Sequence, residues 1–401
     1  MSKVFIVAAK RTAVGRFLGT VANVSAADLA AVVIKDIIKE TKINPAVIDE
    51  VVVGNILMAG QKQGIARQAS IKAGIPQEVP AYGINMICGS GMKSIINAVA
   101  SIKAGDANLI LAGGTESMSD AGFVIPAAVR NGQKMGDITV LDHMVTDGLT
   151  DAFHGYHMGI TAENIAEKYN LSREAQDEFA FASQQKAIAA IDAGRFKGEI
   201  VPVEVVTRKE TIVFDTDEHV NRTTNLEKLG KLRPAFKKDG TVTAGNASGL
   251  NDGASFVLVA SEEAVSKYKL TPLVEIVATG QGAVDPAIMG MGPVPAIANV
   301  LKKANMKLTD MEVVELNEAF AAQSLGVITQ LCKDHNVTRD WFDKVCNVNG
   351  GAIALGHPIG ASGNRITVSL IYEMKRSNKK YGLASLCIGG GMGTAVILKN
   401  V

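Results

Sequence analysis

Short apolar runs rich in β-branched residues alternate along the chain with helix-length segments that carry apolar side chains on one face. In the first part of the chain, the runs typical of buried strands are residues 4–8, 50–56, 107–112 and 256–260. Between the first two, Ser25-Ala-Ala-Asp28 has the capping pattern that opens a helix, and apolar positions from Leu29 to Ile37 give that helix a core face. Strands and helices that alternate in this way predict an α/β protein built in layers.

Residues 120–250 break this pattern. The segment is richer in charge and polar loops, holds four of the six histidines, and contains one long helical stretch that begins at Ser172. We predict that it is an insertion lying on the α/β body. The earlier pattern then resumes with strand-like runs at residues 273–278, 313–316 and 345–348, and two closing strands flank the glycine turn 389–393.

The two parts of the chain that flank the insertion look alike. In the first, the turn 85–91 follows a strand and precedes a helix to residue 104 and a strand that ends at 114. In the second, the glycine-rich turn 349–363 precedes a helix to about residue 374 and a strand that ends at 391. This repeat predicts a duplicated fold, with an N-terminal half at 1–270 that contains the insertion and a C-terminal half at 271–401. A pseudo-two-fold pair of halves would bring the equivalent turns together at one central site.

The composition narrows the class of protein. Apolar residues make up 47% of the 401 positions and charged residues 20%, so a large core is available and disorder is excluded. The net charge of +1 gives no case for a protein that binds nucleic acid or a membrane surface. The 40 glycines exceed the usual share, and they cluster at the turns of the two similar halves.

The cysteines and the uncharged segments bear on the compartment. Four cysteines form no CxxC pair, and a chain of this length needs no disulfide staples, so reduced thiols are expected. The uncharged stretches 286–301 and 345–364 are broken by glycine, proline and asparagine, so neither could span a bilayer as a helix. We therefore expect a cytoplasmic protein with neither membrane nor nucleic acid as a partner.

Cys88 is the first candidate for chemistry. It lies on a strand-to-helix turn between residues that allow tight backbone geometry, Gly89 and Gly91 being its close neighbours. A thiol at a helix N-terminus is close to the positive end of the dipole and to free N–H groups, and both lower its pKa. The sequence therefore predicts a nucleophilic thiolate, with a small buried core thiol as the alternative.

Three further residues belong to this group of candidates. His357 lies between glycine and proline at the turn equivalent to that of Cys88, which favours a general base paired with the thiol over a structural histidine. Cys387 by itself is typical of a core thiol at the end of a strand, and Asn317 of an ordinary helix cap. No set of residues has zinc-ligand spacing, and no GxGxxG or P-loop follows a strand, so neither a metal nor a nucleotide cradle of those types is expected.

Taken together, the motifs closely resemble those of the thiolase family, over essentially the whole chain and most closely its short-chain, acetoacetyl-CoA-specific branch. The motifs that carry the resemblance are Asn85-Met-Ile-Cys-Gly-Ser-Gly-Met92, Gly113-Gly-Thr-Glu-Ser-Met-Ser119, Gly245-Asn-Ala-Ser-Gly-Leu-Asn-Asp-Gly253, Asn317-Glu-Ala-Phe320, Asn349-Gly-Gly-Ala-Ile-Ala-Leu-Gly-His-Pro358 and Cys387-Ile-Gly-Gly-Gly-Met-Gly393. The resemblance implies a thiolase fold: two similar layered α/β halves with an inserted loop domain. It also implies the activity of an acetyl-CoA C-acetyltransferase, the reversible Claisen condensation of two acetyl-CoA to acetoacetyl-CoA and CoA.

The resemblance implies a role for each catalytic candidate. Cys88 would be the nucleophile that becomes acetylated, and His357 the base that activates it. Cys387 would remove a proton from the α-carbon of acetyl-CoA and return it in thiolysis. Asn317 would hold a water that stabilises the enolate oxygen together with His357, while the N–H groups of Cys88 and Gly389 would form a second oxyanion hole.

The inserted region resembles the family's loop domain, which holds coenzyme A. The residues implied for substrate binding are His157 and Met158 at the pantetheine and acyl pocket, Arg222 by the adenine nucleotide, Ser248 on the pantetheine, and Met289 and Phe320 closing the acyl pocket. Acetyl-CoA, acetoacetyl-CoA and CoA would be the ligands, with no metal or redox cofactor. The family is usually dimeric or tetrameric, so a homo-oligomer is expected, most simply a tetramer built as a dimer of dimers.

Other members of the fold are the alternatives. A thiolase for longer 3-ketoacyl-CoA is the nearest, although Tyr156-His-Met158 resembles the short-chain branch. A ketoacyl or hydroxymethylglutaryl synthase would share a Cys–His pair, and Cys387 before its glycines fits thiolase chemistry better. A non-catalytic acyl-binding member would have lost Cys88, His357 or Cys387. A regulatory disulfide between the two cysteines, and the direction of the reaction in the cell, stay open.

Overall fold

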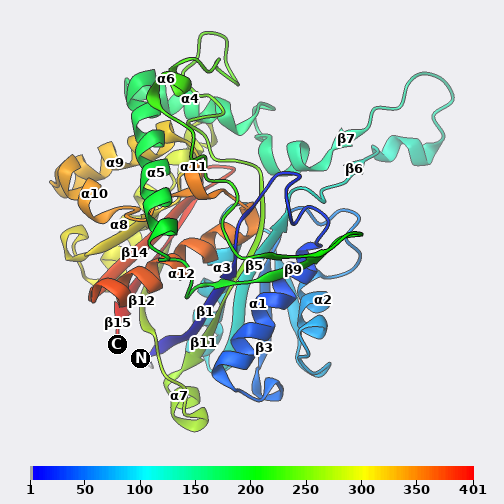
Figure 1. The fold of residues 1–401 in the computed structure, drawn as a ribbon, viewed down its shortest axis with the longest axis vertical. Helices are drawn as coiled ribbons and strands as arrows, with labels where there is room; N and C mark the ends of the chain where they lie inside the picture. Colours follow the sequence, from blue (N-terminus) through cyan, green and yellow to red (C-terminus); the bar gives the residue numbers. More distant parts are fainter. Residues whose placement is uncertain (1–2) are drawn as a thin grey trace.

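The computed structural model describes residues 3–401, and at its centre an eleven-stranded sheet runs through both halves of the chain (Figure 1). The strands of the first half are β1 (Val4–Thr12), β3 (Glu50–Gly54), β4 (Ala81–Ile84), β5 (Leu109–Ser117) and β11 (Asn251–Ser261). Those of the second half are β12 (Val274–Ala283), β13 (Val313–Leu316), β14 (Tyr381–Ile388) and β15 (Met392–Asn400). Their order across the sheet is β13-β14-β15-β12-β1-β11-β5-β3-β4, while the short β2 (Gly15–Arg16) and β8 (Ile200–Val201) pair with β11 and β1.

The strand order repeats outward from the centre of the sheet. There β1 pairs with β12 in antiparallel fashion, so that Phe5 lies opposite Glu275. Outward from β1 the order is β11, β5, β3 and β4, and outward from β12 it is β15, β14 and β13, with matching positions along the chain. The duplication expected from the two similar turns is therefore present in the sheet itself.

One expected strand is missing from the second half. Residues 345–348, the counterpart of β4, form only a single parallel bridge in which Cys346 pairs with Val314. Helix α10 (Arg339–Val345) includes the first of these residues, and Asn347 has a φ of 46°, which is incompatible with an extended strand. The strand prediction is wrong here because Asn347 is in the left-handed region and donates its side-chain N–H to Leu316 O.

Helices cover both faces of each half in layers. α3 (Ser90–Ala104) and α12 (Ile359–Ser377) pack on one another, and their core is shared with the inner faces of both halves of the sheet. α1 (Ala26–Thr41) and α2 (Ile65–Lys72) cover the outer face of the first half. α8 (Pro293–Ala304) and α9 (Ala321–His335) cover the outer face of the second. The two central helices thus bring their N-termini to the middle of the molecule.

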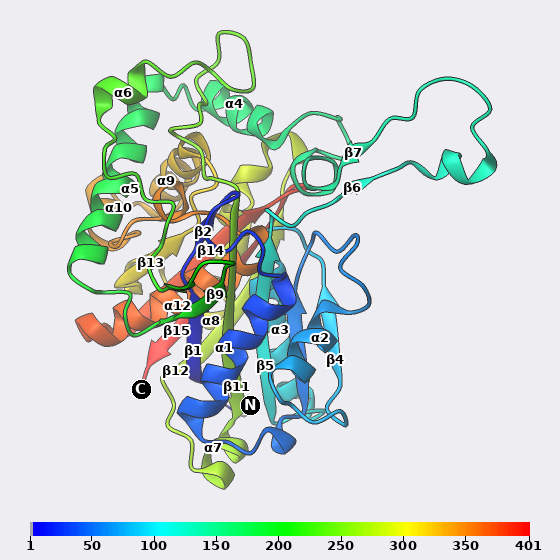
Figure 2. The same cartoon turned by 45° about the vertical axis from the view of Figure 1, so that its right-hand side comes forward.

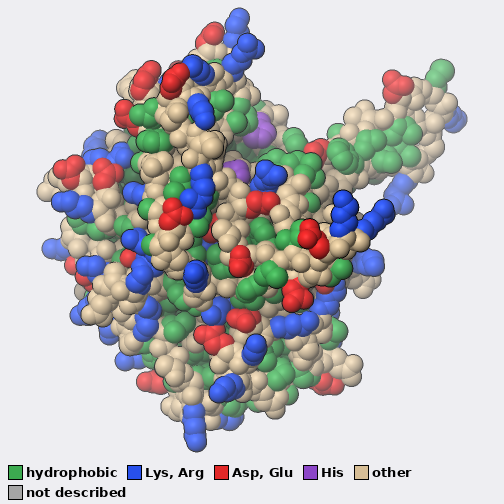
Figure 3. Space-filling model, viewed as in Figure 1, with side chains coloured by type: hydrophobic (Ala, Val, Ile, Leu, Met, Phe, Trp, Pro, Cys, Tyr) green, Lys and Arg blue, Asp and Glu red, His purple; other side chains and the backbone are tan. Residues whose placement is uncertain are grey.

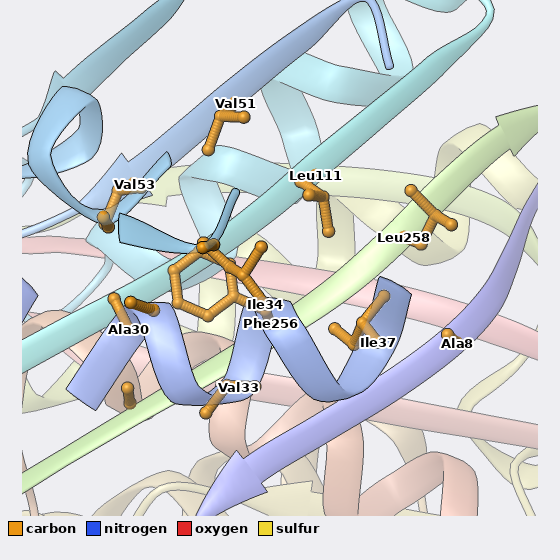
Figure 4. Packing of buried hydrophobic residues seen from close by; sticks show 14 of the residues in the cluster. Ala8, Ala30, Val33, Ile34, Ile37, Val51, Val53, Leu111, Phe256 and Leu258 are labelled. Atoms are coloured by element: carbon orange, nitrogen blue, oxygen red, sulfur yellow. The ribbon is translucent and has the colours of Figure 1, made fainter. Parts of the chain in front are cut away.

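The alternation of β1 shows how the sequence produces these layers. Phe5 joins the outer cluster under α1, and Ile6 joins the inner cluster under α3 and α12, as the two-residue period of a strand requires. Figure 4 shows part of the outer cluster, in which Ile34 and Ile37 of α1 are buried together with Phe256 of β11. The predicted capping pattern is confirmed, because Ser25 Oγ accepts the Asp28 N–H at 3.1 Å.

The inserted region lies between β5 and β11. Its elements are β6 (Phe123–Val124), β7 (Leu141–Asp142), the π-helix η3 (Met144–Leu149), α4 (Met158–Lys168), α5 (Arg173–Asp192), β9 (Val203–Val206), β10 (Thr211–Phe214) and α6 (Leu226–Gly230). Ser172 caps α5 as predicted, accepting the Ala175 N–H. Figures 1 and 2 show that α4, α5 and α6 gather over one end of the body, whereas the arm around β6 and β7 extends away from it.

The remaining elements are short. They are the 3₁₀ turns η1 (Pro45–Val47), η2 (Ala127–Asn131), η4 (Pro286–Met291) and η5 (Leu308–Asp310), and the helices α7 (Glu262–Tyr268) and α11 (Ala352–Leu355). Among residues 3–401, no helix combines the length and hydropathy that a bilayer span requires.

Glycines permit the close approach of the two central helices. A Cβ on Gly91 of α3 would lie 2.9 Å from Gly360 O and 2.9 Å from Asn364 N of α12. On the other side, a Cβ on Gly54 of β3 would lie 2.8 Å from Gly91 N. The first turn of α3 is therefore held between the end of β3 and the first turn of α12, with no room for a side chain at Gly54 or Gly91.

Candidate active site

A strained turn presents Cys88 at the start of α3. Ile87, which precedes it, has a φ of 45°, a conformation that β-branched residues rarely adopt. The Ser90 hydroxyl stabilises this turn, because it accepts the Met86 N–H at 2.8 Å and donates to Ile87 O at 2.7 Å. The turn directs the sulfur into a cavity between the two halves and the inserted region.

The Cys88 thiol is protonated in the resting protein. Burial raises its pKa to about 11, although the N–H groups of Gly389 and of Cys88 itself oppose that shift. The lowered pKa expected from the helix N-terminus is therefore wrong in direction, because loss of hydration outweighs the dipole and the N–H contacts. A base is needed to take the proton when the sulfur attacks.

His357 has the tautomer of a general base. Its Nδ1 lies 2.6 Å from Ser362 Oγ, and that hydroxyl donates its single proton to Pro358 O at 2.9 Å. Nδ1 must then carry the hydrogen, which leaves a lone pair on Nε2, an atom with no hydrogen-bond partner in the protein. Burial, aided by the charge of Arg365, lowers the pKa of His357 to about 3, so the imidazole is neutral.

The backbone of His357 is fixed by Asn251, at the start of β11. Asn251 Oδ1 accepts the His357 N–H at 2.9 Å, and its Nδ2 donates to Gly15 O at 2.9 Å. The amide packs against Gly356, whose φ of 105° needs a glycine and leaves no room for a Cβ beside Asn251. Ser248, only three residues before Asn251, lines the same cavity, so one short segment contacts both the cavity and the base.

Cys387 and Gly389 come from the end of β14. Cys387 is buried, and its pKa is raised well above that of a free thiol by burial and by the nearby Cys88. Both cysteines are free thiols, and both line the cavity. The N–H of Gly389 points at the Cys88 sulfur, and its role in an oxyanion hole stays a prediction.

Asn317 stands directly after β13 and does not line the cavity. Its backbone N–H donates to Ser385 O, but neither Oδ1 nor Nδ2 of its buried side chain has a partner in the protein. Buried amides almost always find a hydrogen-bond partner, in water where the protein supplies none. The geometry is compatible with the role of Asn317 in holding a water, which stays a prediction.

The cavity itself has a volume of about 500 Å³ and is lined mainly by apolar side chains. Nine of the eleven residues chosen from the sequence line it: Cys88, His157, Met158, Ser248, Met289, Phe320, His357, Cys387 and Gly389. Residues from both halves and from the insertion thus meet at the single central site that the repeat predicted. Figure 3 shows histidine side chains where the inserted region meets the body.

An aromatic wall on the insertion side was not predicted from the sequence. Phe236 stacks on His157 with ring centroids 4.6 Å apart, and it meets Phe320 edge to face at 6.1 Å. His157 Nδ1 accepts the Gly159 N–H at the start of α4, so its Nε2 carries the hydrogen. Phe236 is a single phenylalanine in a polar loop, so the sequence did not indicate this contact.

A second, more polar cavity of about 380 Å³ adjoins the first. His219 and Ala244 line both, so the two are adjacent, and Asn221, Thr224 and Lys228 line only the outer one. Arg222 lines neither: its guanidinium forms two hydrogen bonds with the Asp192 carboxylate at 2.6 and 3.2 Å. The role chosen for Arg222 stays a prediction, and Lys228 is the cation that faces this cavity.

Among residues 3–401, no group of three or more His, Cys, Asp or Glu side chains has the arrangement of a metal site. The site is a duplicated α/β frame around the thiol of Cys88, the neutral imidazole of His357 and the thiol of Cys387.

The family follows from comparison with known proteins. Residues 4–263 match the family described as thiolase, N-terminal domain, and residues 270–400 match thiolase, C-terminal domain. The chain belongs to the thiolase family.

Particular relatives refine that class. The chain is 53% identical over 399 residues, 99% of each protein, to the acetyl-CoA acetyltransferase of Pseudomonas aeruginosa. The structure of the acetyl-CoA acetyltransferase from Syntrophomonas wolfei matches it with a TM-score of 0.97 at 41% identity, covering 100% of both chains. Human mitochondrial 3-ketoacyl-CoA thiolase in complex with CoA matches with a TM-score of 0.93 at 46% identity, covering 100% of this chain and 98% of that one.

Proposed function

We propose that the protein is an acetyl-CoA C-acetyltransferase that condenses two acetyl-CoA to acetoacetyl-CoA and CoA, and runs the reverse thiolysis. The observation that carries the proposal is the meeting of Cys88, His357 and Cys387 in one apolar cavity of about 500 Å³. Acetyl-CoA acetyltransferases that match the chain over nearly their full length support it.

The first half of the reaction transfers an acetyl group to Cys88. Nε2 of His357 takes the thiol proton as the sulfur attacks the thioester carbonyl, which is general-base activation of a nucleophile. The CoA sulfur leaves with a proton from Cys387. At this point Cys88 is acetylated, His357 is an imidazolium and Cys387 is a thiolate.

The second half uses those two charges. The Cys387 thiolate removes a proton from the α-carbon of the second acetyl-CoA, and the resulting enolate attacks the acetyl group on Cys88. The C–C bond forms as the C–S bond to Cys88 breaks, and the sulfur recovers its proton from His357. All protons balance over the cycle, and the ion pair is present only during turnover, because burial disfavours both charged forms.

Two sets of donors would stabilise the negative oxygens. The N–H groups of Gly389 and Cys88, which reach the Cys88 sulfur at rest, would donate to the oxygen of the acetyl group. Asn317 and His357 would serve the enolate oxygen through a water. Donors arranged in advance in this way contribute about 10²–10³ each in rate.

The two adjacent cavities fit the shape of coenzyme A. The outer cavity offers Lys228 and Asn221 for the phosphates, and the inner one offers Ser248 and an apolar channel for the pantetheine. His219 stands where they join, with its ring against Gly249. Coenzyme A enters as part of the substrate, and the mechanism needs no resident cofactor.

The end of the inner cavity favours a short acyl group. Met158, Met289 and Phe320 are all buried in one cluster with Cys387, so they limit the space beyond the reacting carbons. A thiolase that accepts longer 3-ketoacyl-CoA is the alternative. Thiolysis rates on C4 to C10 3-ketoacyl-CoA would separate the two, because a closed pocket predicts a steep fall after the C4 substrate.

The assembly and the compartment complete the proposal. The arm of residues 122–142 exposes apolar side chains that a single chain leaves in contact with water, among them Phe123, Ile125 and Met135. Figure 3 shows hydrophobic side chains along the arm. We infer a homo-tetramer in which the arms are covered, working in the cytoplasm.

The experiment that tests the function is thiolysis of acetoacetyl-CoA by the purified protein with free CoA. Wild-type protein should turn over. After incubation with acetyl-CoA and quenching, it should also yield an acetylated Cys88 peptide, detectable by mass spectrometry. Cys88→Ala should lose both signals while retaining its fold. Absence of turnover and of acetylation in wild-type protein would show that the site binds acyl-CoA without this chemistry.

A further inference from the structure

Glu116 has no role in the mechanism above, although it lies in the motif Gly113–Ser119 that carries part of the family resemblance. It stands near the end of β5, and its carboxylate is fully buried. An ionised group in such a place is costly unless its oxygens are fully hydrogen-bonded. The partners of Glu116 therefore indicate what it does.

Four N–H groups donate to the carboxylate. Oε1 accepts from Leu57 N at 3.1 Å and from Asn55 Nδ2 at 2.8 Å, and Oε2 accepts from Ile56 N at 3.1 Å. The fourth donor is Gly360 N at 3.0 Å, which belongs to the first turn of α12 in the other half of the chain. Because every partner is a donor, the geometry suits the ionised carboxylate, and a proton on either oxygen would face an N–H group.

These bonds join two segments that both contact the reacting groups. Ile56 and Leu57 form an apolar cluster with Ile359, and Cys88 packs against that cluster. Gly360 lies in the first turn of α12, the helix whose Ser362 holds the imidazole of His357.

The start of α3 lies between the two segments. Gly54, immediately before the 55–57 loop, leaves no room for a Cβ beside Ser90 and Gly91, and Gly91 in turn leaves none beside Gly360. Fixing the distance between the 55–57 loop and α12 therefore fixes the turn that carries Cys88.

We propose that Glu116 is a positioning residue for acyl transfer, which sets the placement of Cys88 relative to His357 by tying the 55–57 loop to the start of α12. The inference rests on the proposed function. Glu116 itself does not contact substrate in this proposal. It acts through the backbone of both halves.

Burial and hydrogen bonding act in opposite directions on the Glu116 carboxylate, which carries its full charge only above about pH 8. Burial raises the pKa of Glu116 to about 8, against the effect of the Leu57, Ile56 and Gly360 N–H groups, while the charge of Asp252 adds to the rise. The Glu116 charge in turn raises the pKa of Cys88, after the larger effect of burial. Neutralising Glu116 should therefore move alkylation of Cys88 by iodoacetamide to lower pH. Glu116→Asp, which keeps the charge, measures how much of any shift comes from altered packing alone.

The test compares three variants with wild-type protein in the thiolysis assay. Glu116→Gln removes the charge and turns two accepting contacts into donor–donor contacts. Glu116→Asp keeps the charge but is too short to reach both the 55–57 loop and Gly360. Glu163→Gln is the matched control, because the buried Glu163 carboxylate also accepts backbone N–H groups, from Thr241 and Val242, away from the thiols.

Both Glu116 variants should lower kcat by about 10- to 100-fold, the usual effect of misplacing reacting groups by up to 1 Å, with KM for CoA unchanged within about twofold. Only Glu116→Gln should also shift the alkylation profile, and Glu163→Gln should lose thermal stability without either change. A kcat loss no larger than that of Glu163→Gln, or wild-type kcat in Glu116→Asp, would overturn the proposal. If Glu116→Gln does not fold, Glu116→Asp decides alone. Inactive wild-type protein would instead overturn the proposed function.

Discussion

Two opposing influences act on Cys88. The turn at Ile87 and the N–H groups of Gly389 and Cys88 present the sulfur for attack, and burial keeps it protonated. The pKa of His357 is shifted in the opposite direction, since burial lowers it and keeps the imidazole neutral. The resting site is therefore a thiol beside a neutral base, and the reaction itself must create the charges.

This state has a definite pH dependence. A folded-state pKa raised to about 11 means that the thiol persists until the pH approaches that value. Alkylation of Cys88 by iodoacetamide should then rise about tenfold per pH unit between about pH 6 and 10, because the thiolate is the reacting form. Mass spectrometry of the Cys88 peptide measures the rate separately from the partly exposed Cys332. A rate that levels off below about pH 8 would instead indicate a stable thiolate–imidazolium pair.

At the residue scale, the sequence could select positions that a motif marks. Cys88 and His357 were chosen from glycine-flanked turns and Cys387 from the family resemblance, and all three line the cavity, while their roles stay predictions. Asn251 and Ser362 were not found, because their contacts with His357 join segments that only the fold brings together. The direction of the Cys88 pKa shift failed for a related reason, since burial is a property of the whole structure.

At the scale of elements, α5 and α6 form one side of the outer cavity, and two cations near them differ in their contacts. Arg222 is held by Asp192 at the end of α5, and Lys228 of α6 faces the cavity. The sequence could mark this basic run but could not rank its members, because the acidic partner lies 30 residues away.

Substitution of these two cations should separate them. Lys228→Ala should raise KM for CoA by roughly tenfold, the usual effect of losing a hydrogen bond to a charged group. Arg222→Ala is the matched control and should change KM by less than about twofold, since exposed ion pairs contribute little. Steady-state thiolysis at varied CoA concentration gives both values, with kcat unchanged in each variant. The reverse ranking would restore the adenine-site role expected for Arg222.

Strand prediction shows the same division between local and distant causes. Residues 313–316 form β13 as expected, because four apolar or paired positions suit a buried strand. Residues 345–348 look equally apolar, yet the positive φ of Asn347 ends the extended conformation after one bridge. A pattern of side-chain polarity cannot show that an asparagine adopts a left-handed backbone.

At the scale of the whole molecule, the repeat in the sequence predicted two halves and a central site. It could not give the strand order, because the strands at the centre, β15, β12, β1 and β11, come from the end, the interior and the start of the chain. It also gave no sign of the arm, which Figures 1 and 2 show extending away from the body.

The arm allows a test of assembly. Replacing residues 122–142 with a short Gly-Ser linker should remove the exposed apolar side chains and convert the inferred tetramer to a smaller species. Light scattering coupled to size-exclusion chromatography measures the mass, and thiolysis by the shortened protein checks that the cavity remains. Phe123→Ser with Ile125→Ser offers a milder version of the same change, since both side chains are more than half exposed. An unchanged mass in both proteins would assign assembly to another surface.

The contact between the Cys88 turn and the end of β14 also has a consequence for how the protein is made. A Cβ on Gly89 would collide with Ile388, and the N–H of Gly389 completes the surroundings of the sulfur, yet these residues leave the ribosome some 300 positions after Cys88. The growing chain therefore lacks these contacts of Cys88 until β14 is added. A truncated or stalled translation product carries Cys88 without the groups that complete its surroundings, so we expect it to form no acetyl-cysteine.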